Sequence, residues 1–289
     1  MTYHILFNPH AGNGTGETAA HRLDELLSGK MLRYYNMTEI SSYADFLKPI
    51  AADDPIVLAG GDGTINRFLN DTQELSIAQD ILYFAVGSGN DFLHDLGKQK
   101  GAPPFSIKKY LVDLPVVTVQ GKRYRFLNGI GYGIDGYCCE VGDKLRETSS
   151  KPVNYTSIAI KGLLFHYQPV NARITVDGKV HTFRKVWLAP TMNGRFYGGG
   201  MMVAPEQDRL NPERTVSVSV MFGSGKLKTL IVFPSIFKGE HIQHTEMTKV
   251  LTGHEIKVEF DKPTALQIDG ETILDVREYS VTTRVPAKA

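Results

Sequence analysis

The stretch VLAGGDGTINRFLN, residues 57–70, joins an apolar run, a glycine-rich turn with one Asp, and a helical pattern. The apolar run predicts a strand over residues 54–60, and Ile65, Phe68 and Leu69 have the spacing of an apolar helix face. Glycine lets the backbone approach a ligand closely, and the start of a helix attracts negative charge. This order of strand, glycine turn and helix is typical of parallel α/β sheets, which bind ligands at the carboxyl ends of their strands.

The same pattern recurs on both sides of this stretch. Apolar runs predict further strands at residues 3–7, 31–37 and 81–86, and helical spacing predicts helices at 17–27, 42–50 and 90–96. Three strand ends are followed by similar loops: NPHAGNGTG (8–16), GGDGT (60–64) and GSGND (87–91). One such loop alone is more often a plain tight turn, but three at equivalent strand ends indicate a polyphosphate ligand. We therefore expect a doubly wound α/β nucleotide-binding domain over residues 1–120.

Beyond residue 115 the apolar residues alternate with polar ones. The pattern predicts hairpins turning at Gly121 and at Asp177-Gly178, and further strands at 215–222, 254–260, 264–268, 272–276 and 277–285. Helices are expected at 155–167 and 226–233. This predicts a mostly antiparallel β-sandwich domain over residues 121–289, with about the last 10 residues returning to the first domain.

Composition narrows the class of protein. The chain of 289 residues carries 32 Lys and Arg against 31 Asp and Glu, which disfavours nucleic-acid binding through a general basic field. Cys138 and Cys139 are neighbours, so we expect buried thiols in a reducing cytosol rather than a disulfide. No segment approaches the roughly 20 apolar residues of a spanning helix. We expect a cytoplasmic protein that does not span a membrane.

Two other nucleotide signatures fail. The stretch GSGKL (223–227) resembles the end of a P-loop, but Val220 takes the place of the first glycine and Leu227 follows the lysine. The stretch GYGIDG (131–136) satisfies the dinucleotide pattern Gly-x-Gly-x-x-Gly literally. It follows a hairpin pattern, however, so we expect a turn or bulge between strands.

A pair of carboxylates lies near the end of the chain, in LQIDGETIL (266–274). Asp-Gly between alternating runs predicts first of all a hairpin turn. Here Glu271 follows at once, which places Asp269 and Glu271 at the tip of one hairpin. One such group can accept a hydroxyl proton while the other orients it. Phosphoryl transfer needs little beyond such a base, alignment and charge neutralisation.

Six stretches together resemble the diacylglycerol kinase catalytic-domain family, which includes bacterial lipid kinases and sphingosine kinases and is related to NAD kinases. They are FNPHAGNG, GGDGTIN, VGSGND, NGIGYGID, GGGMMVAP and IDGE, in family order across nearly the whole chain. The resemblance implies a lipid kinase that moves the γ-phosphoryl group of ATP to the hydroxyl of diacylglycerol or a similar lipid. It implies peripheral contact with the inner membrane face and allows a homodimer.

The resemblance also implies the site residues. ATP would lie between the two domains and contact Asn8, Pro9, His10, Ala11, Gly12, Thr38, Gly60, Gly61, Asp62, Gly63, Thr64, Ile65, Asn66, Arg67, Ser88, Asn90 and Asp91. Asp62 would face the Mg²⁺-bound phosphates, and Glu271 would be the general base supported by Asp269. A second, structural Mg²⁺ would be held by the Asn211 side chain and main-chain oxygens near Arg214 and Val216. The family usually has Asp, Glu and Arg where this chain has Asn211, Arg67 and His94.

Two alternatives remain open. GGDGT is shared with kinases of soluble acceptors such as NAD, although NAD kinases generally carry Asn-Glu where this chain has Asn90-Asp91. The three departures from the family pattern leave room for a module that binds a nucleotide or lipid without catalysis. The apolar stretches 161–167 and 230–237 are typical of a core, and we expect one of them to border the entrance for an acyl chain.

Overall fold

The computed structural model describes residues 1–86, 90–148, 158, 161–162 and 166–283 of the chain. These residues divide into two compact units, Met1–Val112 and Asp113–Ala289. Most of the helix expected over residues 155–167 lies outside the described residues, and so does Ser88.

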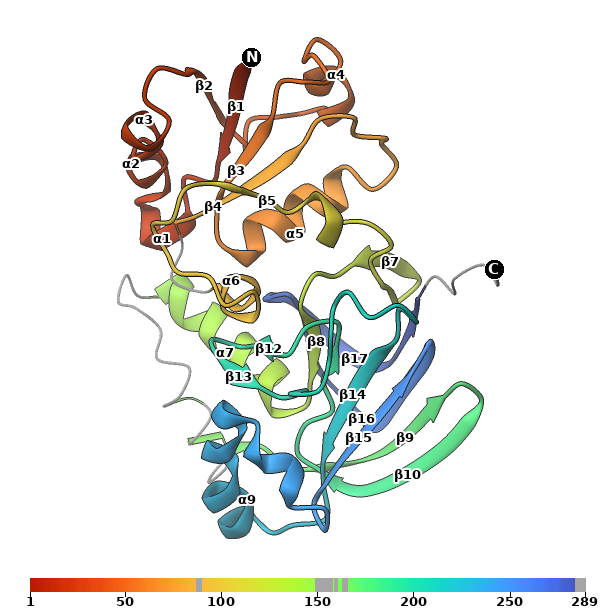
Figure 1. The fold of residues 1–289 in the computed structure, drawn as a ribbon. Helices are drawn as coiled ribbons and strands as arrows, with labels where there is room; N and C mark the ends of the chain where they lie inside the picture. The colour runs from red at the N-terminus through yellow and green to blue at the C-terminus, as the bar shows by residue number, and fades with distance from the viewer. Residues whose placement is uncertain (87–89, 149–157, 159–160, 163–165, 284–289) are drawn as a thin grey trace. The chain divides into compact units, whose positions relative to one another are not determined.

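The first unit is built on a five-stranded sheet in the order β2-β1-β3-β4-β5 (Figure 1). Its strands are β1 (Thr2–Phe7), β2 (Met31–Asn36), β3 (Ile56–Gly60), β4 (Ile81–Ala85) and β5 (Phe105–Ser106). The first four run parallel, and β5 pairs antiparallel with β4. Every residue of β3 is buried, as expected for a central strand covered on both faces.

Helices cover both faces of this sheet, which confirms the doubly wound α/β fold (Figure 1). On one face α2 (Gly16–Ala20) and α3 (Leu23–Leu26) pack Ala20 and Leu23 against β1 and β3. On the other, α4 (Tyr43–Leu47) and α5 (Asp62–Asp71) meet through the rings of Tyr43 and Phe68, 5.5 Å apart. The single helix predicted over 17–27 is thus two short helices, and the first glycine loop contains a further helical turn, α1 (Ala11–Gly14).

The second unit holds antiparallel strands in the order β15-β14-β11-β8-β16-β17-β6-β7, with β9 and β10 attached through β16. Their bounds are β6 (Val116–Val119), β7 (Lys122–Arg125), β8 (Gly129–Tyr132), β9 (Val170–Val176), β10 (Lys179–Val186), β11 (Thr191–Met192), β14 (Val216–Met221), β15 (Thr248–Gly253), β16 (Glu255–Ile268) and β17 (Glu271–Thr282). Two short strands, β12 (Phe196–Tyr197) and β13 (Met201–Met202), form a separate pair.

The long strand β16 organises this unit as a sandwich. Its pairing with β17 shifts register between Glu259 and Thr264, around Pro263, a residue that strands tolerate at such irregularities. The part before the shift pairs with β9 and the part after it pairs with β8. Apolar side chains from both parts and from β6, β14 and β17 therefore share one core. The two strands predicted at 254–260 and 264–268 are therefore one continuous strand that changes its pairing partner from β9 to β8.

The boundary between the two units lies after Val112, whereas the sequence pattern predicted a boundary at residue 120. The reason is that β6 pairs with β7 and β17, so it belongs to the second sheet. Strand β17 continues to Thr282 in that sheet. Residues 280–282, which we expected to turn back toward the first domain, therefore stay in the second unit, and residues 284–289 lie outside the described ones.

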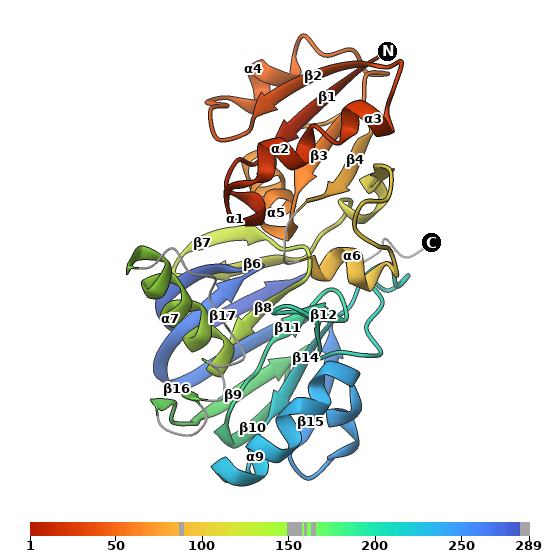
Figure 2. The ribbon, with the colours of Figure 1, turned by 90° about the vertical axis from the view of Figure 1, so that its left-hand side faces the viewer.

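The turn or bulge predicted for GYGIDG was wrong. Strand β8 runs directly into the 15-residue helix α7 (Ile134–Thr148), which lies along one face of the second unit's sheet (Figure 2). Ile134 and Cys138, one helical turn apart, are buried in an apolar cluster there. The helix predicted over 226–233 is present as α9 (Lys226–Val232), followed by the 3₁₀ turns η3 (Phe233–Lys238) and η4 (Glu240–Gln243).

Candidate active site

The carboxyl ends of β1, β3 and β4 lie side by side in the first unit. In the sheet order β2-β1-β3-β4, the chain passes from β1 to β2 on one side and from β3 to β4 on the other side. Ligands of such sheets bind at the point where the direction of the connections reverses, which here is between β1 and β3. Asn8 N donates to Ala59 O at 3.3 Å, and Val86 N donates to Gly60 O at 2.9 Å. The glycine loops that the sequence placed at equivalent strand ends therefore do begin next to one another.

The first loop is shaped by its own polar groups. The Asn8 side chain accepts a hydrogen bond from His10 N at 3.0 Å, and its backbone carbonyl accepts one from Ala11 N at 3.0 Å. The Thr15 hydroxyl donates to Gly12 O at 2.8 Å. At the end of β2, the Thr38 hydroxyl and backbone N–H both bond the Asn36 side chain, at 2.7 and 3.0 Å. Pro9 and Ala11 complete this turn, and His10 is exposed.

Asp62 joins the second loop to the third. It is the first residue of α5, and its Oδ2 accepts hydrogen bonds from Asp91 N at 2.7 Å and Phe92 N at 3.3 Å. Those two N–H groups begin α6 (Asp91–Asp95), so the Asp62 carboxylate satisfies the amino terminus of a helix other than its own. Its Oδ1 is buried. A contact between Asp62 and Mg²⁺ stays a prediction, and the structure gives this carboxylate a positioning role.

Tyr83 supports the same loops from within the sheet. Its hydroxyl lies 2.9 Å from Asn90 Oδ1 and 3.2 Å from Gly60 O. Burial, reinforced by the nearby Asp62 charge, raises the pKa of Tyr83 well above its usual range, so the hydroxyl remains protonated and able to donate. The side chain of Asn90 is therefore held inside the protein.

Within the GGDGT segment, only part of the chain is open to a ligand. Thr64, Ile65 and Asn66 are buried, and Asn66 accepts hydrogen bonds from Asn70 Nδ2 at its carbonyl and side-chain oxygens, at 3.0 and 3.3 Å. Gly63 is exposed. The exposed Arg67 lies 3.5 Å from Asp71 one helical turn further on, an ordinary surface ion pair. The backbone at Gly61–Gly63 is thus the accessible part.

Glycine is required at Gly60 for a reason internal to the protein, but not at Gly63. A Cβ on Gly60 would lie 2.0 Å from Thr64 Oγ1, whereas a Cβ on Gly63 would meet nothing within 4 Å. Gly63 also lies within helix α5, where glycine is less favourable than alanine by roughly 1 kcal/mol. The fold gives no reason for this glycine, and a ligand that approaches the backbone closely would give one.

In the second unit, Asp269 and Glu271 have different surroundings. Asp269 lies in the tight turn between β16 and β17 and accepts hydrogen bonds from the N–H groups of Leu127, Asn128 and Gly129, the last two at 2.8 and 3.0 Å. Glu271 is exposed, and its side chain forms no hydrogen bond or ion pair with the residues that the structure describes. Asp269 therefore fixes the turn, and Glu271 is the carboxylate free to take a proton.

The segment 127–129, which bonds Asp269, is itself held by a buried arginine side chain. Arg209, 8% exposed, donates to Leu127 O at 3.0 Å and to Asn128 Oδ1 at 3.1 Å. Asn193 Nδ2 also donates to Leu127 O, at 2.9 Å. These partners lie 66 to 82 residues from Leu127 and Asn128 along the chain, so no local sequence pattern marks them.

Asp135 is a candidate site residue that the sequence reasoning missed. It lies in the first turn of α7, is 7% exposed, and its buried carboxylate oxygens lie next to the Tyr197 hydroxyl and the backbone N–H groups of Asp135 and Gly136. Burial raises its pKa to about 6, against a smaller lowering effect of the nearby Tyr197 hydroxyl. A buried carboxylate with such a shift is a functional-site signal. The interpretation of GYGIDG as a turn had hidden it.

Asp135 lies close to the carboxylate turn. A Cβ on Gly131 would meet Asp135 Oδ2 at 1.7 Å and Gln267 Nε2 at 2.6 Å, so both side chains lie over this glycine and require it. Gln267 Oε1 accepts a hydrogen bond from Gly270 N at 2.6 Å, next to Glu271. Helix α7 is also tied to this turn, because the Thr272 hydroxyl donates to Asp143 at 2.7 Å. Asp135, Gln267 and Glu271 thus belong to one neighbourhood.

Comparison with known proteins decides the family. The family model "Diacylglycerol kinase catalytic domain" matches residues 2–114, and the model "YegS C-terminal NAD kinase beta sandwich-like domain" matches residues 128–285. The chain belongs to the diacylglycerol kinase catalytic-domain family. Members of the family are kinases, so the protein is an enzyme that uses a nucleotide.

Curated relatives agree with this family, and a solved structure shares the fold. The chain is 28% identical over 284 residues to a diacylglycerol kinase of Bacillus subtilis, covering 92% of this chain and 88% of the relative. It is 25% identical over 264 residues to a diacylglycerol kinase of Mycobacterium tuberculosis, covering 86% and 83%. A crystal structure of a diacylglycerol kinase from Bacillus anthracis has the same fold, with a TM-score of 0.61 at 19% identity over 97% of this chain and 93% of that chain.

Asp135 lies at the edge of an apolar core in the second unit. Ile134, Cys138, Tyr167 and Tyr197 belong to one buried apolar cluster beside it. Burial raises the pKa of Cys138, so its thiol remains neutral and packs as an apolar group, as predicted. Cys139 is half-buried, and neither cysteine forms a disulfide. Among the described helices, none is long and apolar enough to cross a membrane.

Proposed function

We propose that this kinase transfers the γ-phosphoryl group of ATP to the hydroxyl of diacylglycerol or a similar lipid. The observation that carries the proposal is that the loops after β1, β3 and β4 begin next to one another, with Asp62 at the start of α5 bonding the start of α6. Such loops offer backbone N–H groups, and the start of α5 adds a favourable dipole for phosphate. Family membership supports the lipid as the acceptor class.

ATP binds through residues 8–12, Gly61–Gly63 and the 88–91 segment, with Thr38 at the end of the neighbouring strand. Buried Thr64, Ile65 and Asn66 keep the start of α5 in place, and Asp62 keeps the third loop against it. ATP enters as its magnesium complex, so the ion arrives with the substrate and neutralises part of the phosphate charge.

The acceptor binds in the neighbourhood of Asp135 and Glu271. Its polar head lies beside the turn that carries Glu271, near the buried Asp135 carboxylate, and its acyl chains lie over the apolar cluster. Glu271 accepts the hydroxyl proton as the new O–P bond forms. The bond from the γ-phosphorus to the bridging oxygen breaks, and ADP leaves with that electron pair. Asp269 positions the turn that carries Glu271.

An acceptor panel tests the proposal. Formation of ADP from MgATP is measured with mixed micelles of diacylglycerol, with other lipid alcohols, and with NAD in the absence of lipid. We expect lipid to stimulate ADP formation. NAD is the second candidate acceptor, because the carboxyl-terminal domain matches a model described as NAD kinase-like. Phosphorylation of NAD in the absence of lipid would favour NAD over a lipid. Tight ATP binding without transfer to any acceptor would instead favour a non-catalytic module.

Gly63→Ala tests the ATP site. We expect ATP affinity to fall about tenfold or more, because the new Cβ occupies space that the fold leaves open for the ligand. The free energy of unfolding should stay the same or rise by up to about 1 kcal/mol. Calorimetric titration with ATP and urea unfolding measure the two quantities. Gly60→Ala is the contrasting variant, because its Cβ meets Thr64 and should destabilise the protein. Unchanged ATP affinity in Gly63→Ala would place ATP elsewhere.

We propose that one face of α9 docks on an anionic membrane surface. Leu227 and Ile231, one helical turn apart, are each 70% exposed, and Phe237 in η3 is 41% exposed. Lysines 226, 228 and 238 flank them, although Lys228 also pairs with Glu246 at 2.8 Å. Exposed apolar side chains bordered by lysine suit the interface of an anionic bilayer. Residues 230–232 of α9 and most of η3 belong to the stretch 230–237, one of the two that we expected to border a lipid entrance.

The double substitution Leu227→Asp and Ile231→Asp tests this surface. We expect binding to phosphatidylglycerol vesicles to fall about tenfold or more, because two apolar anchors are lost and negative charge is added. Turnover of a short-chain, water-soluble diacylglycerol should be unaffected. Val180→Asp, at an exposed apolar residue of β10, is the matched control and should bind vesicles normally. Full vesicle binding by the α9 variant would rule out this face as the docking surface.

A further inference from the structure

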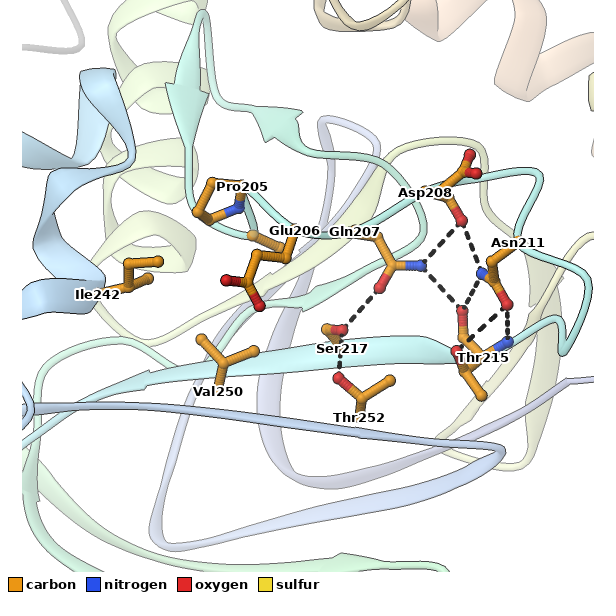
Figure 3. Close-up of a pocket in the computed structure, with 11 residues that line it drawn as sticks. Pro205, Glu206, Gln207, Asp208, Asn211, Thr215, Ser217, Ile242, Val250 and Thr252 are labelled. Carbon is orange, nitrogen blue, oxygen red and sulfur yellow. Dashed lines mark hydrogen bonds between the residues drawn. The ribbon is translucent and has the colours of Figure 1, made fainter.

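The turn before β14 is closed by the side chain of Asn211 (Figure 3). Asn211 Oδ1 accepts hydrogen bonds from Thr215 N at 2.9 Å and from the Thr215 hydroxyl at 3.3 Å. A backbone N–H can only donate, so the side-chain oxygen must face it. The amide nitrogen of Asn211 is thereby fixed on the opposite side.

That nitrogen bridges two backbone carbonyls. Asn211 Nδ2 donates to Asp208 O at 2.6 Å and to Thr215 O at 3.1 Å. A second amide does the same, because Gln207 Nε2 donates to Thr215 O at 2.9 Å and lies 3.4 Å from Asp208 O. The orientation of Gln207 is fixed in turn by Ser217, whose hydroxyl donates to Gln207 Oε1 at 2.6 Å. Two neutral amides thus supply four N–H groups to two carbonyl oxygens (Figure 3).

This arrangement does not fit the second Mg²⁺ that the resemblance implied at Asn211, Arg214 and Val216. A hard divalent cation is bound by oxygen lone pairs, preferably those of carboxylates. Here the Asn211 oxygen accepts from Thr215, and amide N–H groups point at the carbonyls of this turn. Among the described residues, no group of three or more His, Cys, Asp or Glu side chains gathers to hold a metal ion.

We propose that the amides of Asn211 and Gln207 take the place of a cation in closing this turn, so that the fold of the second unit is independent of Mg²⁺. Each amide brings two donors to these carbonyls, in addition to the Asn211 N–H that donates to Asp208 O at 3.1 Å. The identity of residue 211 then determines whether this turn binds a metal ion: with Asn211 it does not. Asn211→Asp removes the donor and adds a carboxylate beside the carbonyls of Asp208 and Thr215, which together form an oxygen site for a divalent ion.

Surrounding charge favours a cation once the donor is removed. Asp208 and Glu206 are exposed and line a cavity of about 180 Å³ together with Asn211 and Thr215. The Asp208 carboxylate accepts a hydrogen bond from Leu210 N at 2.9 Å, which keeps it on this loop. The oxygen site created by Asn211→Asp would therefore lie in a negative environment and should accept Mg²⁺ or Ca²⁺.

Thermal unfolding without nucleotide tests the proposal on the full chain. The wild-type melting temperature is expected to agree within about 1 °C between magnesium chloride and EDTA. Asn211→Asp should melt several degrees lower in EDTA and regain most of that loss in magnesium chloride. Asn211→Ala, the matched control, should be destabilised to the same extent in both buffers because it loses the donor without gaining a ligand.

Two results would overturn the proposal. One is a wild-type melting temperature that rises by several degrees in magnesium chloride and loses that response in Asn211→Ala. The other is an Asn211→Asp variant whose melting temperature is the same in EDTA and in magnesium chloride. If that variant does not fold, calorimetric titration of the wild type with Mg²⁺ alone decides, because binding in the absence of nucleotide contradicts the proposal. No kinase activity enters the test, so its outcome is independent of the acceptor.

Discussion

Glu271→Gln is expected to lower the rate of phosphoryl transfer by about 10²–10⁴-fold, the usual contribution of a positioned general base. Glutamine keeps the size of the side chain but accepts no proton, so the acceptor hydroxyl loses its base. ATP affinity and the melting temperature should not change, because Glu271 is exposed and its side chain forms no hydrogen bond or ion pair with the described residues. The measurements are kcat with MgATP and diacylglycerol micelles, calorimetric titration with ATP, and thermal unfolding.

Glu278→Gln is the matched control for this variant. Glu278 is also exposed on β17, and it pairs with Lys257 at 3.0 Å, a surface pair of small energetic value. We expect its kcat to equal that of the wild type. A wild-type rate in Glu271→Gln would remove Glu271 from the role of base, whatever the acceptor.

Asp135→Asn is expected to make the protein more stable at pH 8 and to reduce turnover of lipid. The folded pKa of Asp135, about 6, lies above the value of about 3.9 for an unperturbed Asp, so the folded state holds the proton more tightly. Ionisation therefore costs stability as pH rises from about 4 to about 6, and the cost is constant above that window. An asparagine never ionises, so the gain should be on the order of 3 kcal/mol at pH 8 and should vanish toward pH 4.

Urea unfolding at several pH values and lipid turnover at pH 8 measure these two effects. Asp275→Asn is the control, because Asp275 is exposed and its left-handed backbone, with φ +56°, also suits asparagine. Its stability difference from the wild type should not depend on pH. Loss of stability at pH 8 in Asp135→Asn would mean that the carboxylate is satisfied in the folded protein. Full turnover by the same variant would remove Asp135 from the acceptor site.

Local sequence pattern was enough to predict the fold class and the placing of the loops. Strand β3, the turn at Gly60 and Gly61 and helix α5 follow from an apolar run, two glycines and a helical face in VLAGGDGTINRFLN. The two domains, one α/β and one mostly antiparallel, are confirmed. Helix α7 was missed because alternating residues before Gly131 led us to extend the strand pattern, although Ile134, Cys138 and Leu145 already had helical spacing.

The roles of individual carboxylates could not be predicted from local pattern. Asp62 bonds residues 29 and 30 positions further along the chain, and Asp269 bonds backbone groups 140 to 142 positions earlier. Only the folded chain brings these partners together. The same holds for Asn211, because its amide bonds a turn whose shape depends on Gln207 and on the left-handed backbone of Arg214, with φ +55°.

Transfer of the γ-phosphorus label of ATP tests the central claim most directly. The protein is incubated with γ-³²P-ATP, magnesium and diacylglycerol in mixed micelles, and the organic phase is extracted and analysed. We expect the label in a lipid phosphomonoester, at a rate that depends on the lipid and is lost in Glu271→Gln. Label that stays in the aqueous phase with every lipid alcohol tested, or that appears in phosphorylated NAD, would contradict a lipid kinase.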